Sequence, residues 1–141
     1  MIEVAEAVRA DVERASQAFR GWSEAEASRD RGAGKWTPKE VLGHLIDSAA
    51  NNHQRFVRAQ LAGAFAGPGY DQVAWVAVHR YRQRPWLELV DLWVALNRQV
   101  AAVIEGMPAE KRGAPCTIGD GEMYSSVCPS GRAAATAWLA T

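Results

Sequence analysis

The stretch from Trp36 to Leu61, WTPKEVLGHLIDSAANNHQRFVRAQL, decides the fold, because it carries the strongest helix signals in the chain. Thr37 and Glu40 predict a capping box, in which each residue bonds the other's backbone amide, and Pro38 suits the first helical position. At 100° per residue, one stripe of this helix is apolar: Val41, Leu42, Leu45, Ile46, Ala49 and Phe56. The opposite stripe is polar: Glu40, His44, Asp47, Ser48, Asn51 and Arg55. The pattern therefore predicts one core face and one polar face.

Two of the three histidines lie on this helix, on different faces. His53 falls within the apolar stripe, which favours a core or boundary residue with one satisfied nitrogen over a ligand. His44 falls on the polar stripe, and the pattern alone predicts a solvated surface histidine there.

The segment from Trp36 to Ser48 resembles the second helix of the DinB-like (DinB/YfiT) superfamily of bacterial four-helix-bundle metalloproteins. The likeness continues through residues 52–56 and, more loosely, through residues 70–72 and 92–97. In that family, a histidine eight residues after the tryptophan and just before a leucine is a divalent-metal ligand, and this position is His44. The resemblance implies zinc or nickel as cofactor. It also implies a thiol-dependent S-transferase, or a related hydrolase or isomerase, that acts on a small-molecule or thiol substrate.

Composition favours one soluble domain covering residues 1–141. Sixteen basic and sixteen acidic residues give a net charge of zero with no basic run, so we expect neither a nucleic-acid nor a membrane partner. Cys116 and Cys128 match no common zinc-ligand spacing and are interpreted as buried or incidental thiols. The N-terminus lacks the apolar core of a signal peptide, and no stretch approaches eighteen apolar residues, so we expect a cytoplasmic protein.

Other segments also show helical periodicity. Apolar residues recur every three or four positions from Ile2 to Trp22, which predicts a first helix, and a polar connection follows over residues 23–35. Asp71 is placed to cap a shorter helix that ends near Gln83. Because that segment is apolar almost all round, we expect it between the long helices or at a subunit contact. His79 near its end is interpreted as a partly buried histidine rather than a ligand.

A third long helix is predicted to begin after Pro85 and to end at Gly106 and Pro108. Its apolar face comprises Trp86, Leu89, Val90, Trp93, Leu96, Val100, Val103, Ile104 and Met107. No alternating strand pattern is present, so the fold class is all-α, an antiparallel four-helix bundle. The fourth helix must come from residues 113–141.

This C-terminal tail differs from the rest of the chain in charge content and in helical periodicity. Only Asp120, Glu122 and Arg132 are charged among its 29 residues, and helix breakers fill residues 125–131. We therefore expect an irregular or shortened last helix. In the resembled family this region carries an H-x-x-x-H pair that completes a three-histidine site, whereas this chain has no histidine after His79.

A catalytic divalent ion requires three protein ligands and one open position. His44 supplies one ligand, Asp47 is a possible second, and Glu122 or Cys128 could approach from the tail. We therefore expect an incomplete metal site. Ser48 lies one turn from His44, but that spacing is too common to indicate catalysis.

Two explanations of the tail remain open. Either a divergent member lost its metal, or a reading-frame change near Gly121 replaced the last helix; the abrupt loss of charge and periodicity favours the second. Two functions also remain open: an enzyme of the metal-dependent type, active or descended from one, and a non-catalytic bundle that acts as a dimeric binding or scaffold protein. We expect a homodimer, because a weak fourth helix leaves apolar area uncovered.

Overall fold

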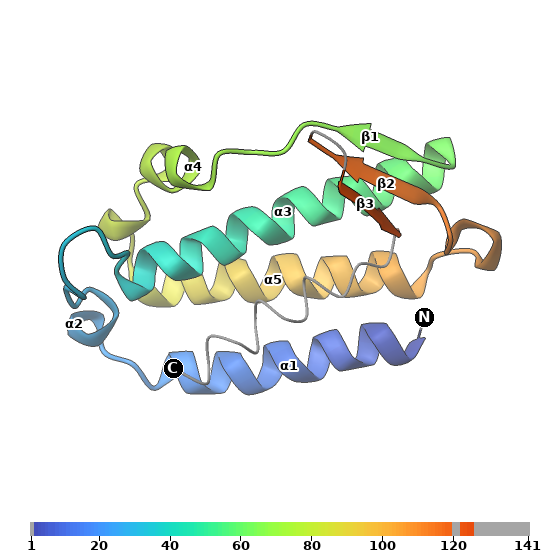
Figure 1. Ribbon diagram of the computed structural model, residues 1–141. Helices are drawn as coiled ribbons and strands as arrows, with labels where there is room; N and C mark the ends of the chain where they lie inside the picture. Colours follow the sequence, from blue (N-terminus) through green and yellow to red (C-terminus); the bar gives the residue numbers. More distant parts are fainter. Residues whose placement is uncertain (1, 120–121, 126–141) are drawn as a thin grey trace.

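The structure is a computed structural model that describes residues 2–119 and 122–125. Three long helices form its body: α1 (Ile2–Arg20), α3 (Pro38–Ala62) and α5 (Trp86–Glu105). Helix α5 packs against both α1 and α3 (Figure 1). All three helices match the sequence-based predictions to within about two residues at each end.

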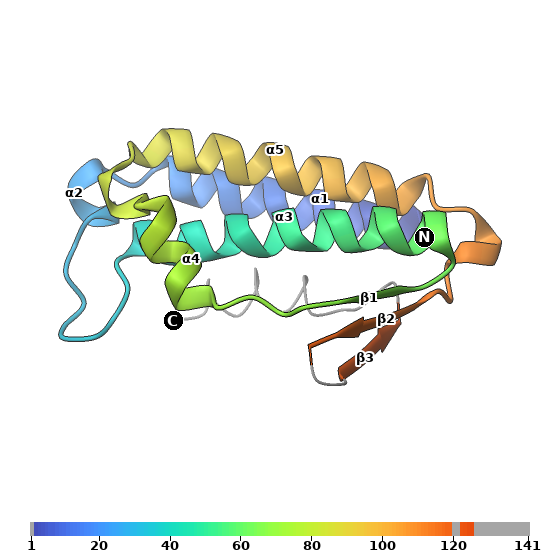
Figure 2. The same cartoon turned by 90° about the horizontal axis from the view of Figure 1, so that it is seen from above.

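Helices α3 and α5 run in the same direction and α1 runs opposite to both (Figure 1). The prediction of an antiparallel bundle is therefore wrong for the α3–α5 pair. Two parallel neighbours need a long return connection, and here it holds β1 (Phe65–Gly67), α4 (Gln72–His79) and the 3-10 turn η1 (Tyr81–Gln83). This connection lies along one side of α3 (Figure 2). Its path brings α4 and η1 onto the N-terminal half of α3.

Helix α3 begins and ends as local chemistry dictates. The carboxylate of Glu40 accepts from the backbone N–H of Thr37 at 2.8 Å, and the Thr37 hydroxyl accepts from the Glu40 amide, which confirms the capping box. Gly63 ends the helix in the left-handed region, with φ of 76°. The predicted apolar stripe is buried at five of its six positions: Leu42, Leu45, Ile46, Ala49 and Phe56.

A short helix, α2 (Glu24–Ala27), occupies the segment predicted as a frayed end and loop. Ser23 and Glu26 form a second capping box that the analysis of the sequence missed. The carboxylate of Glu24 then bonds two other elements: the nearly buried ammonium of Lys39 on α3, and the backbone N–H of Trp86 at 2.9 Å. Helix α2 thus ties the start of α3 to the start of α5.

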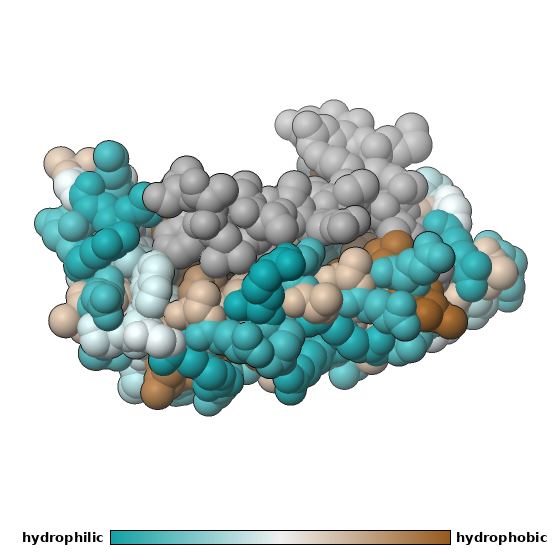
Figure 3. Space-filling model, turned by 90° about the horizontal axis from the view of Figure 1, so that it is seen from below, coloured by the Kyte–Doolittle hydropathy of each residue, from teal (hydrophilic) through white to brown (hydrophobic). Residues whose placement is uncertain are grey.

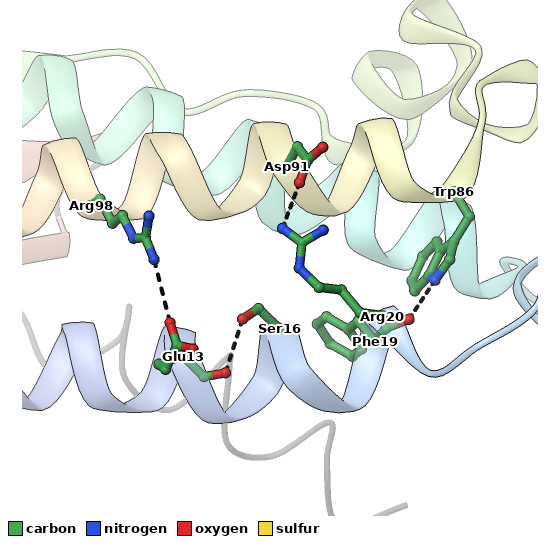
Figure 4. Close-up of polar contacts among 7 residues, drawn as sticks. All are labelled: Glu13, Ser16, Phe19, Arg20, Trp86, Asp91 and Arg98. Atoms are coloured by element: carbon green, nitrogen blue, oxygen red, sulfur yellow. Dashed lines mark hydrogen bonds and ion pairs between the residues drawn. The ribbon is translucent and has the colours of Figure 1, made fainter.

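The interface between α1 and α5 combines aromatic packing with polar contacts (Figure 4). The indole N–H of Trp86 donates to the backbone carbonyl of Phe19 at 2.7 Å, which satisfies a buried donor. The Phe19 ring also meets Trp86 and Trp93 edge to face, at centroid distances of 5.7 and 5.6 Å. Arg20 pairs with Asp91 at 2.5 Å at the exposed margin. The aromatic cluster is therefore the centre of the core.

A small sheet contradicts the expectation that the chain lacks strands. Strand β1 pairs in parallel with β2 (Pro115–Ile118), and β2 pairs antiparallel with β3 (Glu122–Ser125). These strands have three or four residues each, too few to show a period of two in the sequence. Residues 113–141 were the only part of the chain left for a fourth helix, and residues 115–118 and 122–125 of that range form strands instead. Cys116, on β2, is buried in a small cluster with Ala59 and Ala114, as interpreted from the sequence.

Helix α4 lies on the surface of the long helices rather than between them. Asp71 caps it through the Ala74 amide at 3.0 Å, as predicted. Only Val76 of this helix is buried, whereas Val73 and Val78 are 65% and 77% exposed. The expected burial between the long helices is therefore wrong, and the alternative, a subunit contact, stays a prediction.

The remaining predictions about the tail, including Cys128 and the shortened last helix after residue 125, lie outside the described residues. Within the described part, no helix is both long enough and apolar enough to span a membrane. Viewed from below, the surface drawn in colour is mostly hydrophilic with scattered apolar side chains (Figure 3).

Candidate functional site on helices α3 and α4

The polar stripe of α3 is covered instead of facing bulk solvent. Its six residues are buried or partly buried: Glu40, His44, Asp47, Ser48, Asn51 and Arg55. Elements α4 and η1, from the crossover connection, pack against this half of the helix. The simple reading of His44 as a solvated surface histidine is therefore wrong. The stripe that resembles the metal-binding face of a known family is therefore partly covered by the crossover, with Asp47 as its buried member.

Asp47 is the centre of the covered stripe, with only 2% of its surface exposed. Its Oδ1 accepts a hydrogen bond from the Tyr81 hydroxyl at 2.7 Å and lies 2.9 Å from Nδ1 of His79. Its Oδ2 is buried and has no hydrogen-bond partner among the described residues. A buried carboxylate with one unpaired oxygen costs folding free energy, so it is a candidate for a functional role.

The charge state of Asp47 is shifted by its surroundings. Burial raises the pKa of the Asp47 carboxyl, while the Tyr81 hydrogen bond and the nearby His79 and His44 oppose that rise. The same contact acts on the phenol: burial first, and then the bond to Asp47, raise the pKa of Tyr81. Tyr81 therefore stays a neutral hydrogen-bond donor to the carboxylate.

Gly43 allows Tyr81 to reach this position. A Cβ atom at residue 43 would lie 2.0 Å from Cδ2 of the Tyr81 ring, which is far inside van der Waals contact. Glycine within a helix costs about 0.5–1 kcal/mol relative to alanine. The close approach of the aromatic ring to the helix backbone explains why this position carries no side chain.

His44 is half-buried one turn before Asp47. Its Nδ1 is buried and has no hydrogen-bond partner in the described part of the chain. Burial lowers the pKa of His44, and the negative charge of Asp47 partly opposes the shift. The ring of Trp36 lies 5.5 Å from the imidazole, centroid to centroid. The lowered pKa favours the neutral imidazole of His44, which is the state that binds metals.

Aromatic rings from the crossover line the other side of the cluster. Their ring centroids form a chain. Tyr70 lies 4.9 Å from Trp75, Trp75 lies edge to face with His79 at 5.8 Å, and His79 lies 5.2 Å from Tyr81. Burial, followed by the charge of Asp47, raises the pKa of Tyr70. His79 ends α4, as interpreted, but it is exposed rather than partly buried, and its pairing with Asp47 was not predicted. His53 is partly buried on α3, which fits the predicted boundary position.

Sequence reasoning missed Tyr70, Tyr81 and Gly43 as parts of this cluster. A glycine in the middle of a strongly predicted helix was a usable signal, since such a residue generally has a packing reason. Nothing local in the sequence marks the two tyrosines, because they reach the cluster only through the path of the crossover.

The described side chains do not complete a site for a divalent ion. No group of three or more His, Cys, Asp and Glu residues is placed to hold a metal among them. His44 offers one nitrogen, and Oδ1 of Asp47 is already shared by Tyr81 and His79. The donor set therefore falls short of the three protein ligands of a catalytic centre. The predicted roles of His44 and Asp47 as ligands remain predictions. The side chains of Glu122 and Cys128 lie outside the described part.

Two solved structures resemble this chain. YfiT from Bacillus subtilis, described as a probable metal-dependent hydrolase with an unusual four-helix bundle topology, is 20% identical with a TM-score of 0.73; the match covers 98% of this chain and 76% of that chain. A mycothiol-dependent maleylpyruvate isomerase is 10% identical with a TM-score of 0.76, over 99% of this chain and 59% of that chain. At these identities the likeness establishes the four-helix-bundle fold. No curated protein matches the sequence.

The family assignment rests on the sequence over nearly its whole length. The motif around His44 and the fold of the long helices agree with it. A family model described as the DinB superfamily matches residues 7–137. The chain belongs to the DinB superfamily.

Proposed function

We propose that this protein is a small-molecule enzyme of the DinB-like type, related to metal-dependent hydrolases and thiol-dependent S-transferases, with an incomplete metal centre in this chain. The observation that carries the proposal is the covered polar cluster on α3. There, His44 and Asp47 each present a buried polar atom that has no hydrogen-bond partner among the residues that the structure describes. Such atoms lower stability, so their presence favours a site over a structural contact.

The relatives supply the reaction class. One solved relative is described as a probable metal-dependent hydrolase and the other as a mycothiol-dependent isomerase. From these two descriptions we propose a reaction in which water or a thiol attacks a small electrophile. Since this chain spans 59% of the isomerase chain, residues outside the shared region could contribute to that reaction, and the substrate here is proposed only as a class.

Metal analysis of the purified protein tests the state of the centre. We expect well under one equivalent of zinc or nickel per chain by plasma mass spectrometry, because one histidine and one shared carboxylate bind weakly. His44→Ala is expected to change the metal content and the stability little, and His53→Ala serves as its matched control. Stoichiometric metal in the unmodified protein, lost in His44→Ala, would refute the incomplete centre.

A gain-of-function variant tests the role of His44 directly. Placing a helix with an H-x-x-x-H pair after Gly121 should bring in about one metal ion per chain. In that background, His44→Ala should abolish metal binding while His53→Ala should not. Retention of metal without His44 would contradict its assignment as the anchoring ligand.

A second candidate function is that of a dimeric binding or scaffold protein. The exposed apolar side chains of Trp75 and Val78, three positions apart on one face of α4, favour it, because neighbouring exposed apolar residues mark contact surfaces. Sedimentation at high micromolar concentration is expected to show a dimer that Val78→Lys converts to a monomer. A well-folded monomer of the unmodified protein would count against this candidate.

A further inference from the structure

We propose that His79 is a catalytic acid–base residue of this site and that Asp47 is its positioning residue. The proposal rests on the proposed function as a small-molecule enzyme, but not on the presence of a metal ion. It concerns a pair that the fold assembles from α3 and α4, 32 positions apart in the sequence. Neither the resemblance nor the pattern of the sequence assigns a catalytic role to His79.

The pairing fixes which nitrogen of His79 is free. Nδ1 lies 2.9 Å from Oδ1 of Asp47, an oxygen that accepts from Tyr81, so the proposal assigns the ring hydrogen to Nδ1. Nε2 of the neutral ring is then the acceptor. The His79 side chain is 44% exposed although its partner is 3% exposed, so the ring reaches from the interior toward solvent. A small substrate could therefore meet Nε2.

The surrounding side chains hold both partners in place. Tyr81 donates to the same carboxylate oxygen at 2.7 Å and prevents Asp47 from turning away. The rings of Trp75 and Tyr81 lie 5.8 and 5.2 Å from the imidazole, centroid to centroid. A histidine oriented by a buried carboxylate is the arrangement that general bases use, because it sets the tautomer and stabilises the imidazolium that forms.

The other histidines lack these features. His44 has a buried Nδ1 without a partner, so no acceptor among the described residues orients its ring. His53 forms no ion pair with a carboxylate in the described part of the chain. The structure therefore singles out His79 for proton transfer, while His44 remains the proposed metal anchor.

The chemistry follows from the position of Nε2. As water or a thiol attacks an electrophilic carbonyl carbon, its O–H or S–H bond breaks and the proton passes to Nε2. The electron pair of that bond forms the new bond to carbon, and the carbonyl π pair moves to oxygen. When the tetrahedral adduct collapses, the leaving oxygen departs with its bonding pair and takes the proton from Nε2. These steps require only the nucleophile and a small ester or related electrophile.

Imidazole nitrogen NMR tests the orientation without any substrate. In protein labelled with ¹⁵N-histidine at pH 8, we expect His79 to show a protonated Nδ1 and a bare Nε2. In Asp47→Asn, which loses the charge-assisted hydrogen bond, the tautomer should shift toward a protonated Nε2. A protonated Nε2 in the unmodified protein, or a tautomer that is the same in Asp47→Asn, would overturn the positioning role.

Hydrolysis of p-nitrophenyl acetate tests the catalytic role. We expect His79→Gln to lower the rate at least tenfold and Asp47→Asn to lower kcat with little change in KM. The matched control His53→Gln should retain the rate. A rate unaffected by His79→Gln would overturn the proposal. The NMR readout does not depend on metal content, and the hydrolysis assay is run on protein treated with EDTA. Failure of the dyad is therefore distinguishable from failure of the proposed metal centre, which the His44 variants report.

Discussion

Replacing Gly43 with alanine should displace the Tyr81 ring from the candidate site. The new methyl group would lie 2.0 Å from Cδ2 and 2.3 Å from Cγ of Tyr81, so the ring must move. Tyr81 is 3% exposed and packed in the main core, and the room around it is therefore limited. Displacement of the ring also moves its hydroxyl away from Asp47, so the buried carboxylate loses a hydrogen bond.

The expected change in the free energy of unfolding has three contributions, of which the first opposes the other two. Alanine gains about 0.5–1 kcal/mol over glycine within a helix. Overpacking costs about 1–3 kcal/mol. Loss of a hydrogen bond to a charged group costs about 1.5–3 kcal/mol. The net expectation is a destabilisation of about 2–5 kcal/mol, opposite in sign to helix propensity alone.

Urea unfolding followed by tryptophan fluorescence measures this change. Gly113→Ala is the matched control, because its Cβ would meet no atom within 4 Å and should leave stability within about 0.5 kcal/mol. In a Tyr81→Ala background, Gly43→Ala should cost nothing or stabilise, and the double-mutant cycle isolates the contact. A Gly43→Ala protein as stable as the unmodified one would refute the close packing of Tyr81.

Three further changes have definite expected outcomes. Trp93→Ala should cost about 3–5 kcal/mol in chemical denaturation, since the ring is 2% exposed at the core centre, and a loss under about 1 kcal/mol would contradict this. Glu24→Ala should destabilise by about 1–2 kcal/mol, because Lys39 loses its partner, whereas Glu110→Ala should be neutral. Burial raises the folded-state pKa of Asp47, so ionisation of this carboxyl lowers the stability of the native protein as the pH rises above about 4. Asp47→Asn removes that ionisation. The stability of the variant relative to the native protein should therefore increase between pH 4 and pH 8, and a constant difference would contradict the pKa direction.

The sequence by itself determined the long helices. Apolar periodicity and the capping box at Thr37 identified α3 closely, and α1 and α5 followed from the same kind of signal. The motif around His44 also pointed to the family that the comparisons show. These features depend on residues within a few turns of one another, where local propensity and hydrogen bonding decide the conformation.

The composition of the candidate site was decided only by the tertiary structure. Tyr81 and His79 lie 34 and 32 positions beyond Asp47 and meet it because α3 and α5 are parallel and the crossover returns over the polar stripe. The parallel pairing of β1 and β2 is equally non-local. A periodic pattern shows which side of a helix is polar, but not whether solvent or another segment lies against it. That outcome depends on how distant apolar faces pack together, since the burial free energy belongs to the assembled core and not to any one stretch of chain.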